Sequence, residues 1–147
     1  MKPILLYLLL VGIPVLAIAG ILNYGGRLEA PPPIGGSWQL APSVPTGSGH
    51  ACLDIPSGTA LEISQSGVYL ALTLKDPFNA RFSGRIEHAQ VEATGGAAWA
   101  SGCFGHPLVL RAHLQTEGGE ARLVGSLAAA KCGACSPILF RAAPAKK

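Results

Sequence analysis

The sequence predicts an all-β domain, a small antiparallel barrel or sandwich of seven to eight strands, preceded by one N-terminal transmembrane helix. Short runs in which apolar and polar residues alternate with period two indicate the strands. An uncharged apolar stretch over residues 4–22 indicates the helix. The 19 glycines and 12 prolines among 147 residues break the chain too often for a helical bundle.

The helix is predicted from residues 4–22, which run for nineteen positions without a charged side chain. With a rise of 1.5 Å per residue, a helix of this length reaches about 28 Å, which is enough to cross the hydrocarbon core of a bilayer. Gly12 and Pro14 interrupt the run, but a membrane helix tolerates both residues. We expect Pro14 to kink the helix, and we expect a partner helix to pack near Gly12, where the missing side chain permits close approach.

The same segment has two possible fates. It can be cleaved as a signal peptide between Ala19 and Gly20, or it can stay as a signal anchor over residues 1–24. We favour the anchor because the apolar stretch continues past the cleavage site. In both cases Lys2 and the terminal amine place the N-terminus in the cytoplasm. The following domain is therefore expected in the periplasm, and the anchor makes the protein a single-pass protein of a bacterial inner membrane.

Residues 25–36 are predicted to form a linker, because three consecutive prolines between glycine pairs favour an extended, semi-rigid spacer. The exported β-domain follows over residues 37–143, and residues 144–147 form a basic tail. Between positions 35 and 143 the chain carries seven basic and seven acidic residues, so the domain is neutral. Because it has no basic stripe to follow a nucleic-acid backbone, we expect no nucleic-acid partner.

The strands of this domain are predicted in order from the alternation. Leu70, Leu72 and Leu74 share one face of the clearest run, and more polar neighbours share the other. Paired turn residues, such as Gly118-Gly119, separate the runs. The predicted strands span residues 37–41, 61–65, 68–75, 82–87, 90–94, 108–115, 123–127 and 138–142.

The four cysteines, Cys52, Cys103, Cys132 and Cys135, are expected to form two disulfides, because the domain is exported and the count is even. We expect at least one bridge to join the segment from Cys132 to Cys135 back to Cys52 or Cys103. A second hypothesis is a zinc site made by Cys103, His106, Cys132 and Cys135, which form two spaced ligand pairs. A third is a redox-active dithiol at Cys132 and Cys135, which would make the protein an extracytoplasmic thiol-disulfide protein. The strand-like run after this motif, in place of a helix, disfavours the third hypothesis.

No catalytic constellation is found in the sequence. Ser48 lies in a glycine-rich segment near Asp54, but the strand-to-helix elbow that presents a nucleophile is missing. There is no glycine-rich phosphate loop and no HExxH motif. We therefore expect neither an enzyme nor a cofactor.

The segment Gly36-Ser37-Trp38 resembles the GxW opening of lipocalins and avidins, which are small barrels that hold apolar ligands. The resemblance implies that Trp38 closes the barrel floor and that Arg141 stacks on it through a cation–π contact. It also implies an alternative function, a carrier of a small apolar ligand inside the barrel.

The whole body looks like an uncharacterised exported β-module found ahead of cation/proton antiporter domains in some bacteria. This resemblance is carried by Pro33 to Trp38, by Leu61 to Leu70 and by the terminal CxxC motif followed by Phe140-Arg141. It implies a module that works beside a membrane protein. We therefore expect a non-enzymatic accessory or stabilising subunit of an integral membrane protein complex, attached to the lipid bilayer through residues 4–22.

Overall fold

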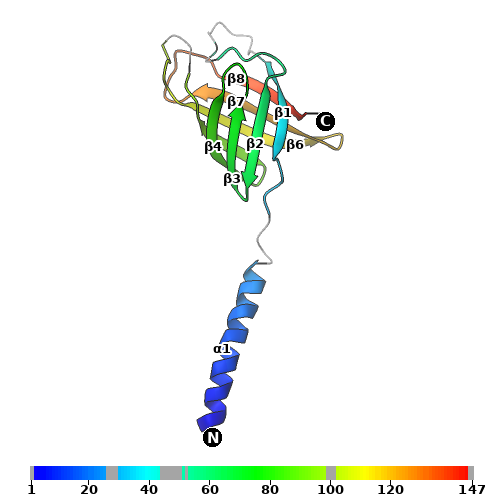
Figure 1. The fold of residues 1–147 in the computed structure, drawn as a ribbon, viewed down its shortest axis with the longest axis vertical. Coiled ribbons are helices and arrows are strands. Elements are labelled where there is room, and N and C mark those ends of the chain that lie inside the picture. The colour runs from blue at the N-terminus through cyan, green and yellow to red at the C-terminus, as the bar shows by residue number, and fades with distance from the viewer. Residues whose placement is uncertain (1, 26–29, 44–50, 52, 99–101, 146–147) are drawn as a thin grey trace. The chain divides into compact units, whose positions relative to one another are not determined.

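The computed structural model describes residues 2–25, 30–43, 51, 53–98 and 102–145. The chain divides into two compact units, Met1–Ala30 and Pro31–Lys147. Helix α1 belongs to the first unit, and strands β1 to β8 belong to the second (Figure 1).

Helix α1 (Lys2–Gly25) covers the predicted membrane segment. Its stretch Leu6–Gly25 is long and apolar enough to cross a membrane. Pro14 lies inside the helix. Side chains such as Leu10 and Leu16 are more than two-thirds exposed, so their apolar surface remains for lipid or for another helix to cover.

The eight strands form one closed antiparallel barrel in sequence order (Figure 1). Each strand pairs with the next along the chain, and β1 also pairs with β8, which closes the barrel. The predicted all-β fold class is therefore confirmed, and the structure is a barrel instead of a sandwich. The strands are β1 (Gly36–Ser43), β2 (Ala60–Ser66), β3 (Tyr69–Leu74), β4 (Ala80–Glu87), β5 (Gln90–Gly95), β6 (Leu108–Glu117), β7 (Glu120–Ala129) and β8 (Ile138–Pro144).

The interior of the barrel is filled by the apolar face of each strand. In β3, Leu70, Leu72 and Leu74 are buried, while Tyr69 and Ala71 are exposed. An eight-stranded barrel is just wide enough for its inward side chains to meet in the middle. The largest fully buried side chains are Phe140, Ile34, Leu61, Leu72, Leu74, Ile86, Leu108, Leu123, Leu127 and Ile138.

The barrel unit begins before residue 37, where the sequence placed the domain boundary. Ile34 is only 1% exposed and belongs to the core. The side chain of Gln65, in β2, holds the backbone here: its Oε1 accepts a hydrogen bond from the Ile34 N–H at 2.8 Å, and its Nε2 donates to the Pro32 carbonyl at 3.2 Å. The last part of the predicted spacer is thus packed on the barrel, because burying the Ile34 side chain is more favourable than leaving it in water.

The two ends of the barrel differ in their connections. At one end, called the turn end, short turns join β2 to β3, β4 to β5 and β6 to β7, and the chain enters at Gly36. Gly118 and Gly119 there have φ angles of 63° and 86°, which suit a tight two-residue hairpin turn. At the opposite end, called the loop end, longer connections join β1 to β2, β5 to β6 and β7 to β8. Binding sites on rigid β scaffolds are most often built from such loops.

Candidate functional site

The loops of the loop end are tied together by covalent and hydrogen bonds. Cys103 in the β5–β6 loop and Cys132 in the β7–β8 loop form a disulfide, with their Cα atoms 5.8 Å apart. The Ala130 N–H donates a hydrogen bond to the Pro107 carbonyl at 2.8 Å. Two loops that are distant in sequence are therefore held side by side at this end.

The expected disulfide chemistry is confirmed for this pair of cysteines. The Cys103–Cys132 bridge joins the segment from Cys132 to Cys135 back to Cys103, one of its two predicted partners. Cys135 is also disulfide-bonded, and Cys52 lies outside the described residues. Ala51 forms an isolated parallel bridge with Ser136, so the β1–β2 loop reaches the β7–β8 loop next to Cys135.

The other two hypotheses for the cysteines do not fit this pairing. A zinc site formed by Cys103, His106, Cys132 and Cys135 requires thiolates, and the sulfur atoms of Cys103 and Cys132 are bonded to each other. A redox dithiol at Cys132 and Cys135 would pair these two residues with one another, whereas Cys132 pairs with Cys103. Within the described residues, no group of three or more His, Cys, Asp or Glu side chains is placed to hold a metal ion.

The tied loops present an uncovered aromatic ring, that of Phe104. Its side chain is 81% exposed, the highest fraction among the large apolar side chains of the described barrel residues. The preceding residue, Cys103, is fully buried. Backbone hydrogen bonds fix the loop on both sides of the ring: the Gly105 N–H donates to the Ala98 carbonyl at 3.0 Å, and the Ala98 N–H donates to the His106 carbonyl at 2.8 Å. The backbone that carries the ring is therefore held in place, while the ring itself is left uncovered.

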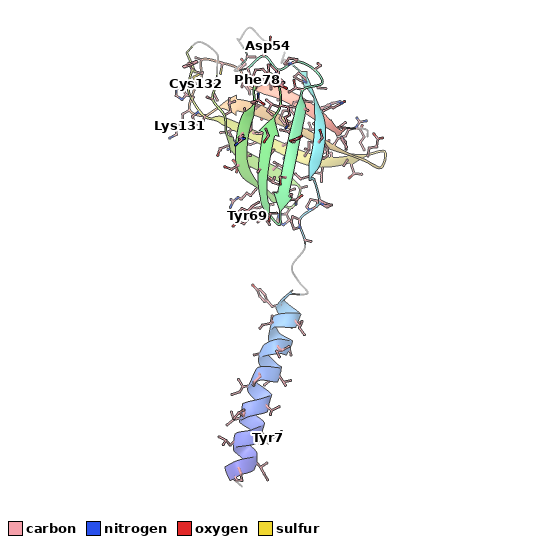
Figure 2. The ribbon with its side chains drawn as sticks, viewed as in Figure 1. Tyr7, Asp54, Tyr69, Phe78, Lys131 and Cys132 are labelled. Carbon is pink, nitrogen blue, oxygen red and sulfur yellow. A yellow bond between two sulfur atoms is a disulfide. The ribbon has the colours of Figure 1, made fainter. Side chains whose placement is uncertain are left out.

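The loop end also carries other apolar and charged side chains. Asp54, Phe78, Lys131 and Cys132 lie around the loop end, and Tyr69 lies at the turn end (Figure 2). Asp54 and Lys131 are exposed and come from different loops, and Phe78 is half-buried. A surface that carries both an exposed aromatic residue and charged side chains is typical of protein-binding surfaces, whose core is depleted in charge and whose rim is polar.

Of the two residues weighed for hydrolysis, Ser48 lies outside the described residues and Asp54 is exposed. The side-chain pairs that are hydrogen-bonded in the described part of the chain are Asn79 with Asp76, Arg111 with Glu92 and Arg122 with Glu117. Across the described ranges, no hydroxyl group is hydrogen-bonded to an imidazole, so no activated nucleophile of that type is formed there.

Trp38 and Arg141 lie on opposite faces of the barrel wall, so the stacking contact that the GxW resemblance implied is wrong. Trp38 is 4% exposed, and its Nε1–H donates a hydrogen bond to the Ile34 carbonyl at 2.9 Å. Arg141 stands between the inward-facing Phe140 and Ala142 and is exposed on the outside. The alternation of side chains along a strand enforces this separation.

The described hollows of the barrel lie on its outer face. The largest, of about 630 Å³, extends over β5 to β8 and the end of β1. Smaller ones lie over β2 and β3 and over β3 to β5. In the described part of the barrel, the inward positions are occupied by buried side chains such as Phe82, Leu110 and Phe140, which weighs against an apolar ligand inside.

Comparison with known proteins finds no family model, no curated protein and no solved structure that matches this chain. The two sequence resemblances therefore stay untested, and the function has to be argued from the fold and its surface.

The exposure of Phe104 at the loop end was not predicted from the sequence. The signal was present in the segment Gly102-Cys103-Phe104-Gly105, where an aromatic residue sits between glycines and beside a cysteine. A pattern of this kind is compatible with a buried or an exposed ring, because burial depends on which other loops cover it.

Proposed function

We propose that this protein is a non-enzymatic, single-pass membrane protein whose barrel binds and braces a partner subunit of an inner-membrane protein complex on the periplasmic side. The surface that binds is the loop end, with Phe104 at its centre. The observation that carries the proposal is the exposure of this ring on a loop that a disulfide and backbone hydrogen bonds hold in place.

The energetics of a fixed, uncovered ring favour binding. Covering a phenylalanine side chain contributes about 1.5–3 kcal/mol from removal of apolar surface from water. A partner that covers Phe104 loses little of this gain to ordering the backbone next to the ring, because the Cys103–Cys132 bridge and the hydrogen bond of Gly105 already constrain it. A few anchors of this kind supply most of the energy of a typical protein interface.

The charges of the barrel support a protein partner over a polyanion. Lys75, Arg85, Arg111 and Arg122 each form an ion pair with a glutamate. All four pairs lie on the exposed surface, where each contributes at most about 1 kcal/mol to stability. In these pairs the positive charges are interspersed with negative ones, so the described surface of the barrel presents no continuous basic stripe to a polyanion.

The anchor supports a partner within the membrane plane. Leu6–Gly25 is long and apolar enough to span a bilayer, and retention of this helix confines the barrel to the membrane surface. A confined domain meets other membrane proteins far more often than a freely diffusing one, because linkage raises its effective concentration.

The test is site-specific photocrosslinking in cells. The photoreactive residue p-benzoylphenylalanine replaces Phe104 in the full chain, and we expect an ultraviolet-dependent adduct with an integral membrane protein that mass spectrometry identifies. Tyr69 is the matched control position: it is also aromatic, it is 71% exposed, and it lies at the opposite end of the barrel. The same probe at position 69 should give no such adduct.

Alanine substitutions at the same two positions measure how much the Phe104 ring contributes to partner binding. Phe104→Ala should lower recovery of the crosslinked partner, captured through a second probe elsewhere on the loop end, by about tenfold. Tyr69→Ala should leave recovery unchanged. Equal adduct formation at both positions, or full recovery with Phe104→Ala, would contradict the proposal.

A further inference from the structure

The largest of the described hollows lies on the outer wall of the barrel, and Phe104 is not among its lining residues. Its floor is formed by β7, where the outward-facing Val124 and Ser126 carry short side chains. Its walls are formed by longer side chains of the neighbouring strands β6 and β8. The residues that line it are Ser43, Gln90, Val91, Glu92, Arg111, Ala112, His113, Val124, Gly125, Ser126, Leu139, Phe140 and Arg141.

The register of the strands places hydrogen-bond donors on both walls of the hollow, β6 and β8. His113 of β6 lies opposite Val124 of β7, and Val124 lies opposite Arg141 of β8. In the adjacent row, Arg111 lies opposite Ser126. Because neighbouring strands are about 4.8 Å apart, the backbones of His113 and Arg141 stand about 10 Å apart across one short side chain. Long side chains from the two walls can therefore converge on a small group between them.

The charge of this hollow is positive. Glu92 is the one carboxylate among its lining residues, and its Oε1 lies 3.0 Å from both Nε and Nη2 of Arg111, so its charge is paired. The side chain of Arg141 forms no ion pair or hydrogen bond with any other residue that the structure describes. An unpaired guanidinium thus faces a recess that also holds the hydroxyl of Ser126 and the imidazole of His113.

We propose that this hollow binds a phosphate group, with Arg141 as the principal contact and Arg111, His113 and Ser126 as further donors. A guanidinium presents two parallel N–H groups that match two oxygens of a phosphate. A tetrahedral phosphate offers more oxygens than a planar carboxylate, so it can accept hydrogen bonds from β6, β7 and β8 together. The apolar Val124 and Leu139 beside these donors also accommodate a short apolar body attached to the phosphate.

The phosphate can come from two sources, a free phosphate ion or the headgroup of an anionic phospholipid. The experiment separates them with the full chain in dodecyl maltoside micelles, which contain no phosphate. In one arm inorganic phosphate is titrated at constant ionic strength against chloride. In the other arm phosphatidylglycerol is added to the micelles, with uncharged monoolein at the same mole fraction as the reference. The readout is the ¹⁵N–¹H spectrum of the arginine Nε–Hε groups and of the Ser126 amide.

The expected result is a saturable shift of the Arg141, Arg111 and Ser126 signals in at least one arm. Arg141→Gln should weaken the apparent affinity by about tenfold, the loss typical of a charge-assisted contact. Arg81→Gln is the matched control, because Arg81 is an exposed arginine on the outer face of β4 and is not part of the hollow. It should leave the affinity within about twofold.

Each outcome decides the proposal. Saturation by phosphatidylglycerol alone assigns the site to a lipid headgroup, and saturation in both arms assigns it to the phosphate group whatever carries it. Signal shifts that do not saturate would indicate general charge screening and overturn the proposal. An affinity that falls equally in the Arg141→Gln and Arg81→Gln variants would overturn it for the same reason. Unchanged spectral dispersion of Arg141→Gln verifies that the variant is folded. The result is independent of the partner proposed above, because Phe104 lies outside this hollow.

Discussion

Gly125 and Gly84 explain how so small a barrel can close. Both residues occupy inward-facing positions opposite an alanine of the neighbouring strand, Ala112 and Ala93 respectively. A Cβ atom on Gly125 would lie 2.6 Å from the Ala112 Cβ, closer than two carbon atoms can approach without displacement. Glycine at such strand positions lets two backbones come close together, so the sheet can coil tightly.

Gly125→Ala should therefore destabilise the barrel by about 2–4 kcal/mol, because the added methyl group forces the backbones of β6 and β7 apart. Gly133→Ala is the control: a Cβ on Gly133, in the β7–β8 loop, meets no atom within 4 Å, and its stability should stay within about 0.5 kcal/mol. The free energy of unfolding is measured on the full chain in detergent by denaturant titration, followed by tryptophan fluorescence. Equal stability of Gly125→Ala and the natural protein would refute this account of closure.

At the scale of the elements, all eight strands were predictable because each carries its own alternation of apolar and polar residues. Closure was not predictable, since the same alternation suits a sandwich, and the pairing of Trp38 with Pro144 joins opposite ends of the domain. The position of Arg141 was predictable from the apolar residues Phe140 and Ala142 on either side of it. The contact with Trp38 that the GxW resemblance implied is incompatible with that alternation, because Trp38 faces inward and Arg141 faces outward.

The features of the surface were less predictable than the strands. The contact between Ile34 and Gln65 joins residues 31 positions apart, so the spacer composition around Ile34 gave no sign of it. The exposure of Phe104 depends on how the β5–β6 and β7–β8 loops meet. The outer hollow depends on short residues of β7 standing between long residues of β6 and β8, which requires the register of three strands.

The pairing of the cysteines, which links the loops of the barrel, can be predicted at the scale of the elements. Four cysteines permit three pairings. Cys103 pairs with Cys132, and Cys135 is disulfide-bonded, so Cys52 is the remaining cysteine of the chain that can pair with Cys135. Ala51 and Ser136, which are next to these two cysteines in the sequence, form a parallel bridge. We expect a second disulfide between Cys52 and Cys135.

Trypsin digestion under non-reducing conditions tests this pairing in the Cys103→Ser, Cys132→Ser double variant. Peptide 28–75, which contains Cys52, should be linked to peptide 132–141, which contains Cys135, and peptide 86–111 should be free. Digestion of the natural protein is the control and should join all three peptides in one product. A double variant in which peptides 28–75 and 132–141 run separately would show that Cys52 and Cys135 are not partners.

At the scale of the whole molecule, the proposed function requires the anchor and the barrel to engage the same partner. Each proposed contact alone is small: one helix-packing site near Gly12 and one loop surface around Phe104. Covalent linkage makes the second contact intramolecular once the first has formed, so the combined affinity exceeds that of either contact. Weakening the helix contact should therefore reduce binding at the loop end, although no residue of the barrel has changed.

Gly12→Leu tests this coupling, because the larger side chain prevents close approach of a partner helix. No atom lies within 4 Å of a Cβ placed on Gly12, so the substitution leaves α1 itself undisturbed. We expect the yield of the photoadduct at position 104 to fall by roughly fivefold, a loss typical of one membrane-helix contact of about 1 kcal/mol. Ala17→Leu is the control, since a residue five positions further on lies on a different face of the helix. An intact mass of 15.0 kDa, corrected for each substitution and for the probe, verifies that residues 1–19 are retained. An undiminished adduct in Gly12→Leu would remove the helix contact from the proposal and leave the barrel surface as the sole point of attachment.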